Sequence, residues 1–229
     1  MVLKETTVNK KALSAIYKNI KKHSPHPKKV KIIAVTKGFS WSTIQSAISN
    51  NLFFIGENKT QETKKKLENK TDKIKIHMIG HLQSNKAKEA VLLYDTIQTV
   101  DSYKIANKIN KEAKKINIKQ KILIQINISN NKNQHGINIK EATPLAMEIQ
   151  KMNNINLIGL MAIGPQTKDK KKIGERYKEL YEKQQWLQKN ISKKIKELSI
   201  GMSEDYTQAL KNSATIIRIG RGLFGSRLK

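Results

Sequence analysis

The stretch VKIIAVTKGFS, residues 30–40, begins with apolar and mostly β-branched residues and ends at Thr36-Lys37-Gly38. Such a run, bounded by a glycine, is typical of a buried strand. Seven more runs of the same kind follow, at residues 51–58, 74–81, 96–101, 121–129, 155–164, 197–203 and 215–221. The chain therefore carries about eight candidate strands.

Helices are expected between several of these strands, because apolar residues recur three and four apart at 41–51, 102–116 and 174–191. Another helix is expected over residues 9–22, within an N-terminal region of residues 1–28. Strands that alternate with helices favour parallel βαβ units. Eight such units predict an α/β protein, a closed (β/α)8 barrel of the TIM type, in a single domain over residues 1–229. An open doubly wound sheet is the alternative, although it would need fewer strands.

The composition limits the possible functions. The chain contains no cysteine, which excludes disulfides and thiolate metal sites, and no apolar stretch long enough to span a bilayer. A cytoplasmic protein with no membrane partner is expected. The formal charge of +27 suggests nucleic-acid binding, but arginine provides only four of the 45 basic residues and aromatic residues only 5% of the chain. An A/T-rich genome would produce this lysine excess by itself, so no specific nucleic-acid binding is expected.

The candidate site lies where the strands end, because barrel active sites are built at the carboxyl ends of the strands. No set of His, Asp and Glu residues has the sequence spacing of a metal site, so no metal is expected. The residues at these ends are Lys37, Asn58, His81, Asp101, Asn127, Ser129, Gly164, Ser203, Gly220 and Arg221.

Lys37 stands at the end of the first strand. Apolar walls and limited water disfavour the ammonium form of a lysine and lower its pKa. A neutral amine can then attack a carbonyl and form a Schiff base. Gly38 lets the chain turn without a side chain crowding the adduct. The alternative is an ordinary surface lysine that ends a strand.

Two glycine-containing segments predict a phosphate site. SIGMSED, residues 199–205, and RIGRGLFG, residues 218–225, contain the ends of the last two strands, where barrels commonly bind phosphate through backbone N–H groups. Ser203 supplies a hydroxyl there and Arg221 a charge. GRGLFG also matches the dinucleotide pattern G-x-G-x-x-G, but no further strand and no acidic residue follow it. The alternative is a glycine-rich segment without a ligand.

A Schiff-base lysine and a phosphate site on one rim suggest pyridoxal 5′-phosphate, which carries both an aldehyde and a phosphate. Its ring nitrogen needs a partner, and Arg218 is the candidate. An arginine would leave this nitrogen unprotonated and the ring a weak electron sink, which argues against demanding carbanion chemistry.

Several motifs resemble, in order, those of the pyridoxal phosphate homeostasis proteins, a family similar to the N-terminal barrel of alanine racemase. The motifs are IIAVTKGFS (32–40), FIGENKTQE (54–62), HMIGHLQSNKAK (77–88), QINIS (125–129), GLMAIGP (159–165), SIGMSEDYTQAL (199–210) and IRIGRGLFGSR (217–227). The resemblance implies that Lys37 holds the cofactor, that Asn58 lies near its ring and that Arg218 faces the ring nitrogen.

The resemblance also implies that Ser203, Gly220 and the residue after it, Arg221, hold the phosphate. Many relatives have Thr or Ser at the position of Arg221, so this side chain either contacts the phosphate or turns outward. The motif GHLQSNK, residues 80–86, has two interpretations. His81 contacts the cofactor, or the segment is a helix start with Ser84 as the N-cap.

The function implied is a monomeric protein that binds pyridoxal phosphate and influences vitamin B6 and amino-acid balance, with PLP-dependent apoenzymes as candidate partners. The family has no established turnover, so no enzyme activity and no catalytic residue are expected. A racemase-like enzyme of low activity is the alternative. In alanine racemases a tyrosine from a separate C-terminal domain supplies the second base, and no counterpart is expected in this chain.

Overall fold

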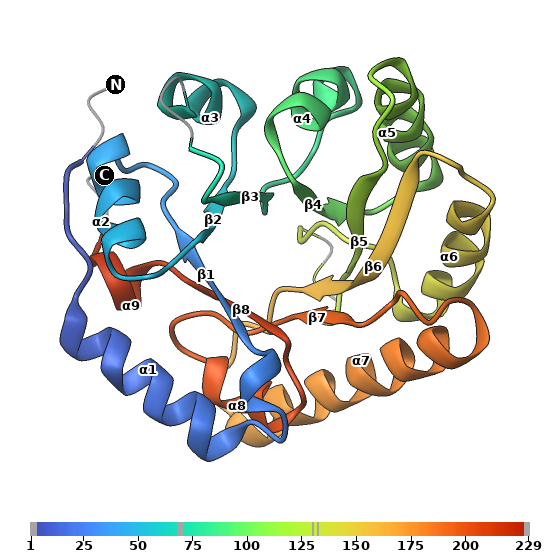
Figure 1. Ribbon diagram of the computed structural model, residues 1–229. Coiled ribbons are helices and arrows are strands. Elements are labelled where there is room, and N and C mark those ends of the chain that lie inside the picture. The colour runs from blue at the N-terminus through green and yellow to red at the C-terminus, as the bar shows by residue number, and fades with distance from the viewer. Residues whose placement is uncertain (1–3, 68–70, 130, 132, 227–229) are drawn as a thin grey trace.

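The computed structural model describes residues 4–67, 71–129, 131 and 133–226. Within these residues, eight parallel strands form a closed barrel in which β1 pairs with β8 (Figure 1). The predicted (β/α)8 barrel is confirmed, and the open sheet is wrong. Each predicted run coincides with one strand, and only β5 begins outside its run, by one residue. The strands are β1 Lys31–Val35, β2 Phe54–Glu57, β3 Lys75–Met78, β4 Thr96–Val100, β5 Gln120–Ile126, β6 Ile155–Ala162, β7 Glu197–Ser199 and β8 Ile216–Ile219.

Helices surround the barrel (Figure 1). The four expected helices are present as α1, α2, α5 and α7. In the described part of the chain the helices are α1 Lys10–His23, α2 Trp41–Ser49, α3 Thr60–Lys66, α4 Ala87–Leu93, α5 Tyr103–Lys115, α6 Ala142–Gln150, α7 Lys170–Asn190, α8 Tyr206–Lys211 and α9 Arg221–Phe224.

Two helices depart from the prediction for local reasons. The N-terminus of α7 lies at Lys170 rather than residue 174, because the Asp169 carboxylate accepts the backbone N–H groups of Lys171 and Lys172. Helix α3 has no apolar stripe, and the side chains that it buries are Thr60, Thr63 and Lys66. A helix with a polar buried face cannot be found from hydrophobic periodicity.

The apolar core has two parts, which follow from the alternation of side chains along a strand. In β1, Ile32 and Ala34 belong to the main core, where the sheet meets the helices. Ile33 and Val35 form a smaller cluster with Ile216. The remaining space inside the barrel takes polar side chains, including buried Arg218 on β8.

Closure of the barrel brings the first and last described residues together. Residues of β1 pair with those of β8, with Ile33 opposite Arg218. The Lys4 ammonium donates to the carbonyl of Ser226 at 2.8 Å, and the backbone N–H of Asn9 donates to the carbonyl of Leu223 at 2.9 Å. Helix α1 packs against α8 and α9. Among the described residues, no helix has both the length and the apolar character needed to cross a membrane.

Candidate functional site

Five of the six predicted site residues, Lys37, Asn58, Ser203, Gly220 and Arg221, lie just beyond the carboxyl ends of strands, on one rim of the barrel. The sixth, Arg218, lies within β8. Lys37 follows β1 and Asn58 follows β2, and these strands are neighbours in which Val35 lies opposite Gly56. Both residues are two positions past this pair, so the register places them side by side. Gly220 and Arg221 follow β8, on the other side of β1.

Lys37 lies in a tight turn and is half-buried. The turn is closed by a hydrogen bond from the Phe39 N–H to the Thr36 carbonyl, 3.0 Å. The Thr36 N–H donates to the Gly56 carbonyl at 3.1 Å, which continues the pairing with β2. Gly38 has φ +77°, a left-handed conformation that favours glycine. The predicted role of Gly38 in the turn is confirmed by this geometry.

A buried ion pair holds the backbone on both sides of Lys37. The Lys66 ammonium donates to the Thr36 carbonyl at 2.9 Å and contacts the carboxylates of Glu57 (2.9 Å) and Glu62 (2.5 Å). Glu62 Oε1 also accepts the N–H of Gly38 at 2.5 Å. The backbone positions before and after Lys37 are therefore tied to helix α3, which restricts the directions that the Lys37 side chain can take.

The carboxylate at the centre of this network is fully buried. Burial raises the pKa of Glu57 above its ordinary value, and the Lys66 ammonium and the Thr36 hydroxyl offset this only in part. Lys66 is 4% exposed, and its ammonium is occupied by carboxylates. Sequence reasoning missed Lys66, Glu57 and Glu62. The available signals were the spacing of four between Glu62 and Lys66 and the presence of a charge, Glu57, inside a strand.

Asn58 presents an unsatisfied acceptor. Its Oδ1 is buried and accepts no hydrogen bond from the residues described. The backbone of Asn58 lies close to Gly80, at the end of β3. Only a glycine fits there, because a Cβ at Gly80 would lie 2.4 Å from the Asn58 carbonyl oxygen. A buried acceptor without a donor costs about 1–3 kcal/mol. The site therefore offers this oxygen to a bound molecule.

Arg218 lies inside the barrel and is 4% exposed. Its Nη1 donates to the carbonyl and the Oγ of Ser199, each at 2.7 Å, and its Nη2 donates to the Ala162 carbonyl at 2.8 Å. Three acceptors from β6 and β7 thus fix the plane of the guanidinium. A flexible lysine would not hold this fork geometry.

The charge of Arg218 is only partly compensated. Burial lowers the pKa of the guanidinium, whereas nearby Tyr177 and Asp205 raise it. The Tyr177 hydroxyl donates to Asp205 Oδ2 at 2.6 Å, and burial, followed by Asp205, raises the pKa of Tyr177. Gly164 is structural here, because a Cβ would lie 2.3 Å from Asp205 Oδ2 and 2.5 Å from the Tyr177 oxygen.

The loops after β7 and β8 meet at Ser203. Its Oγ accepts the backbone N–H of Gly222 at 3.1 Å, which leaves the hydroxyl proton available for a ligand. Gly220 precedes α9, and its carbonyl accepts the N–H groups of Leu223 and Phe224. The Arg221 side chain turns outward, with 67% exposure, and pairs with Glu204 at 2.7 Å. Of the two orientations expected for Arg221, the structure has the outward one.

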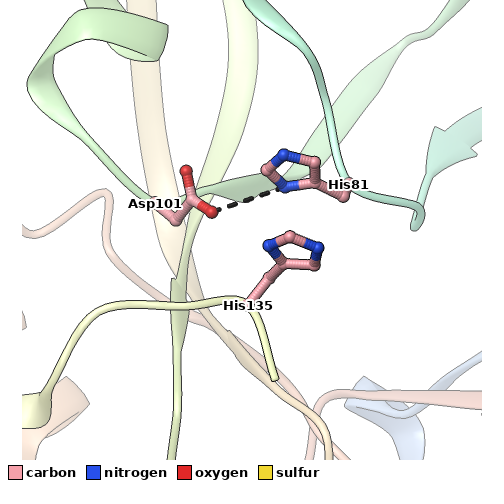
Figure 2. Close-up of side chains that lie close together, drawn as sticks. All are labelled: His81, Asp101 and His135. Carbon is pink, nitrogen blue, oxygen red and sulfur yellow. Dashed lines mark ion pairs between the residues drawn. The ribbon is translucent and has the colours of Figure 1, made fainter. Parts of the chain in front are cut away.

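A group that the sequence spacing did not reveal lies at the ends of β3, β4 and β5 (Figure 2). His81 Nδ1 is 3.5 Å from Asp101 Oδ2, and the His81 ring stacks on His135 with 3.7 Å between the ring centres and 8° between the planes. One ligand atom from each residue lies within reach of a common metal ion. However, two parallel rings that are stacked cannot both direct an in-plane lone pair at one ion, so this arrangement is not assigned to a metal.

Part of the segment GHLQSNK forms a short helix. Ser84–Lys86 forms a short 3-10 helix that leads into α4, and Gln83 rather than Ser84 precedes it. The expectation that Ser84 is the N-cap is wrong, because the chain enters the 3-10 turn one residue earlier. His81 is exposed and turns towards Asp101 and His135.

Comparison with known proteins agrees with this geometry. Residues 8–228 match the family model described as alanine racemase, N-terminal domain. A pyridoxal phosphate homeostasis protein from Buchnera aphidicola is 37% identical over 212 residues, which cover 92% of each chain. The chain belongs to this protein family.

Solved structures extend the comparison. PipY of Synechococcus elongatus, without PLP, is similar to this member of the pyridoxal phosphate homeostasis family with a TM-score of 0.85 and 27% identity, covering 94% of this chain and 99% of PipY. The structure of PipY with PLP bound has a TM-score of 0.80 and 28% identity over the same shares of the two chains. An alanine racemase from Clostridium difficile has a TM-score of 0.73 at 18% identity, and the match covers 97% of this chain and 58% of that protein. At this identity the racemase supports the barrel fold alone.

Proposed function

We propose that this protein binds pyridoxal 5′-phosphate at the carboxyl rim of the barrel and acts in intracellular PLP and amino-acid homeostasis. The observation that carries the proposal is the buried, unpartnered Oδ1 of Asn58 beside the restrained turn of Lys37. The names of the relatives and the PLP-bound structure of PipY support the choice of ligand.

The residues present suit this cofactor. Lys37 would hold it as a Schiff base, with Asn58 near the ring. Ser203 offers a free hydroxyl proton to the phosphate, and the backbone at Gly220 and Arg221 approaches it without the Arg221 side chain. When bound, the cofactor supplies an aldehyde and an electron-withdrawing ring.

Arg218 would face the ring nitrogen. A guanidinium donates hydrogen bonds and accepts none, so it favours an unprotonated nitrogen. The ring is then a weak electron sink, and we infer that the protein carries or buffers the cofactor rather than turning over substrates. The racemase-like alternative predicts amino-acid racemisation at the ~1–10³ s⁻¹ typical of enzymes. Polarimetry with alanine and other simple amino acids distinguishes the two.

We further propose that residues 1–229 act as one cofactor-binding domain, of which residues 1–3, 68–70, 130, 132 and 227–229 lie outside the described part of the chain. The protein is a cytoplasmic monomer, it has no specific nucleic-acid or membrane partner, and PLP-dependent apoenzymes are the recipients of its cofactor. Sedimentation at micromolar concentration tests the monomer, and transfer of PLP to an apoenzyme tests the partner.

The decisive experiment maps the attachment site. The protein is mixed with pyridoxal phosphate, its absorbance is recorded, the mixture is reduced with borohydride, and the labelled peptide is identified by mass spectrometry. Mapping is necessary because a lysine-rich surface gives weak, non-specific imines. We expect label at Lys37, and no label at this position or visible band in Lys37→Ala.

Lys59→Ala is the matched control, because Lys59 lies next to Asn58 but is exposed. This variant is expected to retain both the band and the label at Lys37. Label spread over exposed lysines in proportion to their exposure, with Lys37→Ala unchanged, would overturn the proposal.

A further inference from the structure

A cavity lies at the opposite end of the barrel from the proposed cofactor site. Its volume is about 540 Å³, within the range of about 300–1,000 Å³ typical of small-molecule sites. It is lined by residues that begin strands, so it opens at the amino-terminal mouth of the barrel. We call it the basal pocket, and its strand residues include Lys31, Phe54, Lys75, Thr96, Gln120 and Ile216.

The basal pocket carries an excess of positive charge. Six lysines line it, against two carboxylates, Glu197 and Asp95. Lys31 pairs with Glu197, and Lys75 lies 3.4 Å from Asp95. Within the described part of the chain the other four have no carboxylate within 4.0 Å. The six are Lys31, Lys75, Lys119, Lys121, Lys194 and Lys196.

A chain of hydrogen bonds runs through the barrel from Arg218 to the floor of this pocket. Arg218 Nη1 donates to Ser199 Oγ at 2.7 Å, and Ser199 Oγ donates to Gln98 Oε1 at 2.7 Å. The amide nitrogen of Gln98 lies 2.9 Å from Nδ1 of His77, which lines the basal pocket. All four side chains are buried, with at most 5% exposure.

The donor and the acceptor of every hydrogen bond in this series follow from its first member, Arg218. A guanidinium is a donor only, so Ser199 Oγ must accept, and its single proton is left for Gln98 Oε1. The Gln98 amide then turns its NH₂ group towards His77. His77 Nδ1 must accept this bond, and a neutral imidazole therefore carries its proton on Nε2.

His77 is neutral near pH 7, because burial lowers its pKa to about 4. The hydrogen bond found for the His77 ring among the described residues is made by Nδ1 and not by Nε2. The ring lies at 76° to the ring of Phe54, with 5.8 Å between ring centres. The floor of the basal pocket thus offers an N–H donor, and its walls offer ammonium groups. Phosphate oxygens satisfy both kinds of group.

We propose that the basal pocket binds a small anion with two or more phosphate groups, and that the chain from His77 to Arg218 couples its binding to the cofactor site. The first part is independent of the proposed function, and the second part rests on it. An acceptor at His77 Nε2–H strengthens each following hydrogen bond, because such chains are cooperative. The coupling is reciprocal, so bound cofactor changes the affinity for the anion by the same factor.

The binding test uses inorganic pyrophosphate, titrated by calorimetry at about 0.15 M salt to suppress loose surface association. The triple variant Lys121→Gln, Lys194→Gln, Lys196→Gln is compared with Lys170→Gln, Lys171→Gln, Lys172→Gln. Both triples remove three charges from exposed lysines, but the second lies on α7 outside the pocket. The titrations are run without PLP and with saturating PLP. Bound PLP keeps pyrophosphate out of the proposed phosphate site at Ser203 and Gly220.

We expect one saturable site in the wild type, weakened about tenfold or more in the basal triple and changed less than about twofold in the control triple. Equal weakening in both triples, or no saturable binding, would overturn the anion site. The same titration with ATP identifies the source of the phosphates. Tighter binding of ATP than of pyrophosphate indicates a nucleotide, and equal binding indicates the inorganic anion.

The coupling is tested through the visible spectrum of the PLP-loaded protein. Pyrophosphate is expected to shift the absorbance of the wild type and to change its PLP affinity severalfold. Ser199→Ala, which keeps the bond from Arg218 to the Ser199 carbonyl, is expected to bind pyrophosphate without this response. An unchanged wild-type spectrum at saturating pyrophosphate would overturn the coupling. Imidazole ¹⁵N shifts of His77 in the wild type report anion contact without any variant, and they do so even if no PLP binds.

Discussion

The burial of Lys66 is difficult to recognise from the sequence. In a chain with so many lysines, each one looks like a surface residue, yet Lys66 is buried against Glu57 and Glu62. A buried ion pair of this kind adds little net stability, because desolvation offsets the attraction. The ion pair instead fixes the position of the backbone around Lys37. Lys37, by contrast, is half-buried at the rim, where a ligand can reach it.

His77 makes stability depend on pH. Burial, and then nearby Lys31 and Lys121, lower its pKa to about 4, while Asp95 acts in the opposite direction. In the unfolded chain a histidine titrates near 6.5. Between these values the unfolded chain binds more protons, so the free energy of unfolding falls as the pH falls. We predict a loss of about 3 kcal/mol from this group between pH 6.5 and 4.

Urea unfolding at a series of pH values measures this effect, with His77→Gln as the comparison. The variant is expected to show a flatter dependence by about the same amount, because glutamine does not titrate. Carboxylates such as Glu57 titrate in both proteins and cancel in the difference. Parallel curves for the two proteins would contradict the assignment.

At the scale of the elements, substitution of glycine by alanine is predicted to change the free energy of unfolding in opposite directions at two positions. In β6, a Cβ at Gly159 would lie 1.9 Å from the Glu197 carbonyl of β7, so Gly159→Ala must push two paired strands apart. We predict a loss of about 3 kcal/mol or more in the free energy of unfolding. In α7, a Cβ at Gly174 meets nothing closer than 3.7 Å. Gly174→Ala is predicted to add about 0.5–1 kcal/mol.

Urea denaturation of the two variants beside the wild type checks both signs. The pair controls for the general effect of an added methyl group. A stable Gly159→Ala would mean that β6 and β7 are not in the register described, in which Gly159 lies opposite Glu197.

The strands could be predicted from sequence because strands buried on both faces are continuous apolar runs. The longer helices could be predicted because their buried faces are apolar. Helix α3 could not, since it buries threonines and a lysine whose partners come from other parts of the chain. The sequence indicates a pattern within a segment, whereas a buried polar network depends on which segments meet.

The same distinction applies to the sites at the scale of the whole molecule. The rim residues follow from the barrel rule that strand ends converge, so Lys37 and Ser203 could be named in advance. The hydrogen-bond chain could not, because His77, Gln98 and Ser199 come from β3, β4 and β7 and meet only inside the closed barrel. The outward turn of Arg221 also depends on its neighbour Glu204.

The net charge of +27 has a consequence for the whole surface. Outside the basal pocket, basic residues also occur in the last turns of helices such as α1, α3 and α5, so binding to DNA should be electrostatic and indifferent to sequence. We predict that affinity for a random duplex falls roughly 100-fold or more between about 50 and 200 mM salt. Fluorescence anisotropy with two unrelated duplexes measures this. A strong preference for one duplex at physiological salt would contradict it.

The contact of Lys4 with Ser226 makes the chain, in space, almost a ring. The barrel depends on which strands are neighbours in space and not on the order in which they are translated. In space, β8 and β1 are neighbours just as β1 and β2 are. A circularly permuted gene, with these ends joined and new ends opened in an outer loop, would encode the same set of strand neighbours. By the same reasoning, the turn at Lys37 follows β1 and the loop at Gly220 follows β8, so residues far apart in the sequence lie on adjoining strands. Removal of either β1 or β8 would therefore remove part of the proposed site.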